Sequence, residues 1–148
     1  MADTAYLKGR VEDYVRKVLA ERYGTVFRPA KVKLTTGGDH AFDAVSGDGQ
    51  VIAAIKTSGC NRRGQGEAGK VRAAITDLYF LSLAKARTRL LVLTDPGFHK
   101  YVAKELRGKI VPEVALELVP LPQEMQEEVT RIQIAASKEV SPAGGARE

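Results

Sequence analysis

Apolar residues recur with a helical period at the start of the chain and with a strand period in the segment that follows. Across residues 6–23 they return every third or fourth position, which places them on one face of an α-helix, and Gly24 marks its end. Residues 31–35 alternate between polar and apolar side chains, the pattern of a strand with one buried face. Gly37 and Gly38 then indicate a turn.

A β-hairpin is the clearest local feature of the sequence. Two short apolar runs, residues 41–45 and 50–56, are separated by the tetrapeptide Ser46-Gly47-Asp48-Gly49. Glycine and aspartate accept the positive φ values that tight turns between antiparallel strands require. We therefore expect the two runs to pair as neighbouring strands.

The second half of the chain alternates between helices and strands. A largely buried helix is predicted at residues 67–86, with Ile75 and Tyr79 on its apolar side, and a strand buried on both faces at 89–94. Asp95 as N-cap and Pro96 at the first helical position begin another helix, and a strand at 114–118 and a helix at 123–138 follow. The order α-β-β-β-α-β-α-β-α predicts the α/β (α+β) class, with a mixed sheet flanked by helices on both faces.

The composition is that of an ordinary globular domain and excludes several classes of protein. The chain has 148 residues, 44% of them hydrophobic and 28% charged, so we expect a single domain over residues 1–140 and a flexible tail over 141–148. The one cysteine, Cys60, cannot form an internal disulfide, and no Cys/His spacing matches a zinc site. No apolar run approaches the roughly 20 residues that span a bilayer, and the first residues lack the apolar core of a secretion signal. We therefore expect a cytoplasmic protein with no membrane partner.

The net charge of +5 is unevenly distributed along the chain. Lys and Arg outnumber Asp and Glu by 8 to 7 in residues 1–55 and by 12 to 4 in residues 56–109, but are outnumbered by 7 to 3 in residues 110–148. Cationic side chains that contact phosphates release counterions and dominate the affinity of proteins for nucleic acids. The basic middle of the chain is therefore a candidate polyanion surface, although scattered solvated charges would give the same count.

An acid and a lysine fall on the two strands of the predicted hairpin. Asp43 lies in the first strand, within the segment FDAV, and Lys56 ends the second, within IAAIKTS. Because side chains alternate along strands, the two residues can project from the same face of the sheet. With a helix before the hairpin, and an Arg/Gly-rich loop, a helix and a buried strand after it, this arrangement resembles the PD-(D/E)xK phosphodiesterase superfamily, which has the restriction-endonuclease-like fold.

The resemblance covers residues 6–119 and implies an αβββαβ core, extended here by a last strand and helix. It implies metal-dependent hydrolysis of DNA phosphodiester bonds, with Mg²⁺ or Mn²⁺ bound by carboxylates, water and substrate oxygens. By the same resemblance, Asp43 is a metal ligand and Lys56 is the catalytic lysine. Glu12 matches the acid that many members carry in the first helix, where it holds the metal ion or a water.

The sequence departs from the family motif at Ala54, where the second acid of the motif is expected. Three explanations remain open. Glu67, at the start of the next helix, replaces the missing metal ligand; Glu12 suffices as the partner of Asp43; or the site is disabled and the domain binds nucleic acid without cutting it.

The same reasoning identifies candidate nucleic-acid contacts beside the motif. They are polar or cationic residues of the segment that follows Lys56, namely Thr57, Ser58, Arg62, Arg63, Lys70 and Arg72. A chain of this size lacks room for a separate recognition domain, so sequence specificity would need a homodimer or another subunit, and we expect a homodimer. The predicted function is a small Mg²⁺-dependent endonuclease. The alternatives are a disabled module that binds nucleic acid or a partner protein, and a small-ligand α/β protein, although the chain has no Gly-x-Gly-x-x-Gly segment between a strand and a helix.

Overall fold

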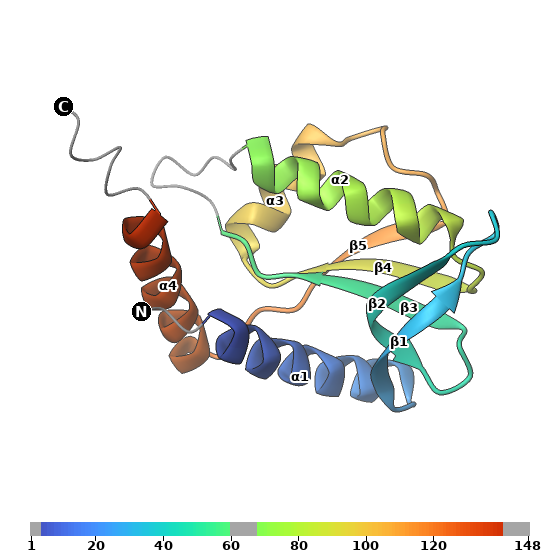
Figure 1. Cartoon of the computed structure of the whole chain (residues 1–148), viewed down its shortest axis with the longest axis horizontal. Helices are drawn as coiled ribbons and strands as arrows, with labels where there is room; N and C mark the ends of the chain where they lie inside the picture. The colour runs from blue at the N-terminus through green and yellow to red at the C-terminus, as the bar shows by residue number, and fades with distance from the viewer. Residues whose placement is uncertain (1–3, 60–67, 141–148) are drawn as a thin grey trace.

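The computed structural model describes residues 4–59 and 68–140 and shows one mixed β-sheet with helices on both faces (Figure 1). The order of elements is the one that the hydrophobic pattern predicts. Their bounds are α1 (Thr4–Tyr23), β1 (Phe27–Lys33), β2 (Asp39–Ser46), β3 (Val51–Lys56), α2 (Ala68–Leu83), β4 (Thr88–Leu93), α3 (Pro96–Glu105), β5 (Val114–Leu118) and α4 (Gln123–Val140).

The strands lie side by side in the order β1-β2-β3-β4-β5. The first three form an antiparallel meander, and β3, β4 and β5 run parallel to one another. Parallel neighbours need a crossover connection, which α2 and α3 supply. Both crossovers step in the same direction along the sheet, so right-handed connections place α2 and α3 on the same face. The helices α1 and α4 cover the opposite face (Figure 1).

Two hydrophobic clusters, one on each face of the sheet, hold these layers together. On β3, Ile52 and Ala54 belong to the cluster under α2 and α3, whereas Ala53 and Ile55 belong to the cluster under α1 and α4. This alternation follows from the two-residue period of a strand. The central strands β3 and β4 are therefore apolar on both faces, as is usual for parallel strands covered by helices.

The predicted start of α3 is confirmed. The Asp95 carboxylate accepts a hydrogen bond of 2.8 Å from the Phe98 backbone N–H, and Pro96 occupies the first helical turn. Gly24, which follows α1, has a φ of 70°, a left-handed value that glycine adopts without steric cost. Local sequence signals therefore set these two helix ends.

Two parts of the sequence-based picture differ from the structure. β1 begins at Phe27, four residues earlier than predicted, because the strand continues through Pro29. On α2, Ile75 is 45% exposed and Tyr79 is 58% exposed, so the helix is not largely buried. The face that meets the sheet is formed by Ala74, Leu78 and Leu81. Within the part of the chain that the structure describes, no helix is long and apolar enough to cross a membrane.

The core makes a direct prediction about stability. Ile52 is fully buried between β2 and β4, whereas Ile75 is exposed on α2. Ile52→Ala should lower the free energy of unfolding by about 2–5 kcal/mol, because it leaves a cavity in the sheet-helix interface. Ile75→Ala should change it by less than about 0.5 kcal/mol. Urea denaturation measures both, and an equal loss in the two variants would contradict the assigned packing.

Candidate active site

A β-bulge in β2 sets the position of Asp43. Arg28 pairs with Val45 and Ala30 pairs with Phe42, so one residue of β1, Pro29, lies opposite two residues of β2, Asp43 and Ala44. Proline has no backbone N–H and cannot continue the hydrogen-bond ladder, which favours a bulge at this point. A bulge interrupts the alternation of side chains and re-aims the residue at its centre.

The re-aimed carboxylate of Asp43 lies between two strands. The pairing of β2 with β3 includes Ala44 opposite Ala53 and Val45 opposite Ile52. Two residues further along β3, the Ile55 backbone N–H donates a hydrogen bond of 2.8 Å to Asp43 Oδ2. A side-chain oxygen thus takes the role of a backbone acceptor at the point where the two strands separate.

Helix α1 brings a second acid to the same place. Arg16 Nη1 donates a hydrogen bond of 2.7 Å to the Asp43 backbone oxygen, which fixes α1 against the bulge. Glu12, one turn earlier, has a side chain that is only 13% exposed and forms ion pairs of 3.7 Å with both Lys8 and Arg16. Glu12 Oε2 is nevertheless buried without a hydrogen-bond partner, because the Lys8 ammonium lies beyond hydrogen-bonding distance.

The pKa of Glu12 reflects its burial and the charges around it. Burial raises its pKa above the ordinary value of 4.5, and the negative charge of Asp43 raises it further. Lys8 and Arg16 act in the opposite direction but do not cancel the effect. The two carboxylates therefore form a pair that a bound cation would stabilise.

Lys56 has a different partner from the one that strand alternation suggests. Its Nζ forms an ion pair of 2.9 Å with Asp77 Oδ2 of α2, and both side chains are partly buried. Lys56 lies on the α2 face of the sheet, whereas Asp43 lies between the strands beside Glu12 of α1. The bulge explains the difference, because the alternation that would place Asp43 and Lys56 on one face is broken at Asp43.

The remaining predicted residues are placed as follows. Ala54 is 4% exposed and packs in the cluster under α2, where it offers no ligand atom. The Thr57 backbone oxygen accepts a hydrogen bond of 3.1 Å from Gln133 Nε2 of α4, and Lys70 Nζ donates one of 3.1 Å to the Gly59 oxygen. Ser58 is partly buried and Arg72 is exposed. Arg62, Arg63 and Glu67 lie outside the described residues.

Asp77 is the site residue that sequence reasoning missed. It lies on α2 between Ala74 and Leu78, two residues of the buried face, so the helical period already placed an acid beside the apolar stripe. Among the side chains that the structure describes, no group of three or more from His, Cys, Asp or Glu could hold a metal ion. The charged residues of the candidate site therefore fall into two separate pairs: the two acids Glu12 and Asp43, and the ion pair of Asp77 with Lys56.

The coupling between Glu12 and Asp43 can be measured. In Asp43→Asn the pKa of Glu12, followed by carbon-13 NMR of its carboxyl group, should move down toward 4.5, because one of the two causes of its elevation is removed. Asp39→Asn, a change of the same charge on the exposed start of β2, should leave it unchanged. An unaltered pKa in Asp43→Asn would show that the two carboxylates do not interact.

The same raised pKa predicts a pH-dependent effect on stability. The folded state binds the Glu12 proton more tightly than the unfolded state, so the ionised side chain destabilises the fold above its folded pKa. Glu12→Gln should therefore be more stable than the parent at neutral pH, and the gain should vanish as the pH falls below 4.5. Thermal unfolding across this pH range tests the sign, and a gain that grows toward low pH would contradict it.

No family model, curated protein or solved structure matches the chain. The residues described above and their contacts are therefore the basis on which a function is assigned.

Proposed function

We propose that the protein is a metal-dependent nuclease of the restriction-endonuclease-like fold, and that Glu12 and Asp43 hold its metal ion. The observation that carries the proposal is geometric. Arg16 of α1 contacts both residues, with a hydrogen bond of 2.7 Å to the Asp43 backbone oxygen and an ion pair of 3.7 Å with Glu12, which brings the two acids to the point where β2 and β3 separate. Carboxylate pairs of this kind are what hard divalent cations require.

The architecture supports the assignment to this fold. An αβββαβ order is present, with an antiparallel meander continued by a parallel strand, and an acid on β2 precedes a lysine at the end of β3. Of the extra elements, β5 extends the sheet at the edge away from β2, and α4 lies beside α1, where Glu128 forms an ion pair with Arg10.

The residues present fit a magnesium ion. Mg²⁺ is commonly held by one or two carboxylates, with water and phosphate oxygens completing its coordination. Asp43 has one oxygen engaged by the Ile55 N–H, and Glu12 has a buried oxygen without a hydrogen-bond partner. A cation bound there would stabilise the ionised form of Glu12, whose pKa is raised by burial and by the charge of Asp43.

The other residues have roles that follow from their contacts. A bound Mg²⁺ would lower the pKa of an attacking water and neutralise charge on the phosphate. Lys56 supplies a positive charge at the end of β3, suited to the charge that develops on the phosphoryl group. Asp77 positions the Lys56 ammonium through their 2.9 Å ion pair, and Ile55 positions Asp43 through its backbone N–H.

The charge distribution makes DNA the proposed substrate. Residues 56–109 begin at Lys56 and carry 12 cationic side chains against 4 acidic ones, so phosphate contacts would cluster after the catalytic lysine. Among the described residues of this segment, exposed Arg72 and half-buried Lys70 lie at the start of α2. A homodimer would bring two such sites onto one duplex.

A second candidate function is binding of nucleic acid without cleavage. It is favoured by Ala54, which provides no ligand, and by the ion pair that already compensates the charge of Lys56. The two candidates share the fold and the basic segment. They differ in whether Glu12 and Asp43 alone form a working metal site.

Asp43→Asn is the sharpest test of cleavage. Asparagine keeps an oxygen that can accept the Ile55 hydrogen bond, so the variant removes the charge while retaining the fold. With Mg²⁺ or Mn²⁺, the parent should cut plasmid and single-stranded DNA, and the variant should be slower by about 100-fold or more. Asp39→Asn is the matched control and should cut at the parental rate.

Equal cleavage by the parent and Asp43→Asn would exclude Asp43 from catalysis. If neither protein cuts with any divalent metal while both bind DNA, the nuclease proposal fails and the second candidate stands.

Ala54→Glu distinguishes the two candidate functions by adding the acid that the family motif has at this position. The Ala54 side chain points into the cluster under α2, so a glutamate there should not raise the cleavage rate of a site that works through Glu12 and Asp43. Ala54→Gln controls for the added volume at this buried position. If the parent is inert and Ala54→Glu, but not Ala54→Gln, restores cleavage by tenfold or more, the natural site is disabled.

A further inference from the structure

An apolar hollow of about 300 Å³ lies between α2 and the segment that joins α3 to β5. We call it the α2 hollow, and it is lined by Ile75, Leu78, Tyr79 and Ser82 on one side and by Leu106 and residues 109–111 on the other. Five large apolar side chains are exposed among the described residues, and three of them line this hollow, namely Ile75, Tyr79 and Val111. Exposed apolar side chains gathered in one place indicate a surface that a partner covers.

The ring of Tyr79 is supported by two further rings. It meets the Phe80 ring edge-on, with centroids 5.3 Å apart and ring planes at 71°. Phe80 in turn stacks on His40 of β2, with centroids 4.0 Å apart and planes at 8°. Tyr79 is nevertheless 58% exposed. It therefore offers a flat, supported surface on which another aromatic ring can stack.

The charge around the α2 hollow is positive. Among the described residues that line it, Lys109 alone is charged. Arg107 follows the lining residue Leu106, and Arg72 lies one turn before Ile75 on the exposed side of α2. All three cationic side chains are exposed.

This charge belongs to one face of the molecule. Residues 68–113 carry nine Lys or Arg against four Asp or Glu, whereas α1 and α4, on the opposite face of the sheet, together carry seven of each (Figure 1). The acids of the segment beside the hollow, Glu105 and Glu113, are exposed but do not line it. The α2 hollow therefore favours an anionic partner, and a second copy docked through the same face would be repelled.

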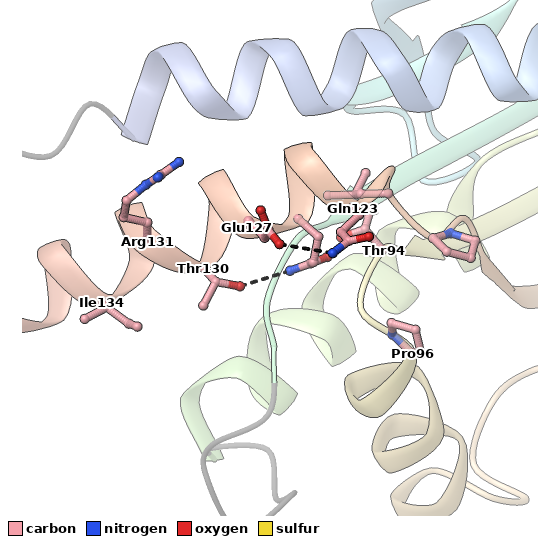
Figure 2. A pocket seen from close by; sticks show the side chains of 10 residues that line it. Thr94, Pro96, Gln123, Glu127, Thr130, Arg131 and Ile134 are labelled. Carbon is pink, nitrogen blue, oxygen red and sulfur yellow. Dashed lines mark hydrogen bonds between the residues drawn. The ribbon is translucent and has the colours of Figure 1, made fainter.

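A larger groove, of about 620 Å³, lies between α4 and the corner at Thr94 and Pro96 (Figure 2). Its lining contains both Glu127 and Arg131, and Glu127 accepts a hydrogen bond of 3.2 Å from Gln123 Nε2. Side chains of opposite charge favour no ligand of either sign. Of these two sites, the α2 hollow is therefore the one whose charge identifies a partner.

We propose that the α2 hollow binds an unpaired base of a DNA strand, which stacks on Tyr79 while the neighbouring phosphates contact Arg72 and Lys109. Proteins that bind single strands combine aromatic stacking surfaces with cationic side chains along the backbone. A paired base is covered by its neighbours, so the hollow favours a single strand over a duplex. The proposal rests on the nucleic-acid partner that the two candidate functions share, and not on the metal site of Glu12 and Asp43.

The probe is a fluorescein-labelled oligothymidylate of about 12 nucleotides, whose anisotropy reports binding to the full-length protein. EDTA is present, so no metal-dependent cleavage occurs. The parent should bind this strand at least about tenfold more tightly than an abasic strand of the same length, which has the same phosphates but no bases. A duplex of the same length should also bind at least about tenfold more weakly, because a base must first leave the stack.

Substitutions at Tyr79 test the stacking. Tyr79→Leu keeps an apolar side chain but removes the ring, so it should weaken binding of oligothymidylate by about 5- to 100-fold and leave binding of the abasic strand unchanged. Tyr79→Phe keeps the ring and should bind as the parent does. A 2-aminopurine base placed in the strand should lose fluorescence on binding to the parent and to Tyr79→Phe, but not to Tyr79→Leu.

A substitution at Lys109 tests the phosphate contact. Lys109→Gln should lower the slope of log Kd against log salt concentration by about 0.7, the value for one phosphate contact with a single strand. Arg131→Gln is the matched control, because it removes an exposed cation from α4 on the opposite face, and it should leave the slope unchanged.

The proposal is overturned if Tyr79→Leu binds oligothymidylate as tightly as the parent, or if the abasic strand or the duplex binds the parent equally well. It is also overturned if sedimentation shows a parental dimer that Tyr79→Leu abolishes without a change in DNA affinity, which would assign the hollow to a second copy. Circular dichroism of each variant shows that it is folded. Asp43→Asn should bind the strand as the parent does, so failure of the nuclease proposal is separately visible.

Discussion

The hydrogen bond from the Ile55 N–H to the Asp43 carboxylate is the interaction on which the arrangement of the site depends. It forms because Pro29 cannot extend the ladder of β1, so that β2 bulges and turns Asp43 toward β3. The carboxylate then holds β2 and β3 together where their backbones separate. It also lies beside Glu12, and Arg16 of α1 is fixed to the backbone of the same residue.

The charges around this point form two compensated groups on the two faces of the sheet. Glu12 on the α1 side has Lys8 and Arg16 as partners, and Lys56 on the α2 side has Asp77. The ion pairs offset the cost of partly burying these charges, since an unpaired charge in such a place would strongly destabilise the fold. Glu12 remains the exception, because burial and Asp43 together raise its pKa despite the two cations. The imbalance is therefore located at the pair to which we assign the metal ion.

Much of the fold was predictable because local signals and the period of the apolar residues agree. The order of all the described elements, the hairpin turn at Gly49 and the capping of α3 by Asp95 follow from the sequence. The exposure of Ile75 and Tyr79 did not, because an apolar helix gives no indication of which half of its surface will meet a sheet. Tertiary packing decides that question, and single-residue patterns do not contain it.

The sequence alone indicates candidate residues for the site, but not how they are arranged. Asp43, Lys56 and Glu12 are candidates from the sequence, and in the structure Arg16 contacts both Glu12 and the backbone of Asp43. Strand alternation placed Asp43 and Lys56 on one face, which is wrong because the bulge shifts the alternation by one residue. Pro29, which has no backbone N–H, is the residue of the sequence that indicates this bulge. Asp77 was visible only as an acid next to a buried helical stripe, and its pairing with Lys56 depends on how α2 crosses β3.

Binding of Mn²⁺ to the full-length protein, followed by calorimetry, tests the central claim that Glu12 and Asp43 form a metal site. We predict one Mn²⁺ per chain in the parent, weakened by about tenfold or more in both Glu12→Gln and Asp43→Asn. Glu21→Gln, which removes a charge from an exposed position of the same helix, should bind as the parent does. Mn²⁺ binding that is unchanged in both variants, or absent from the parent at millimolar metal, would contradict the account.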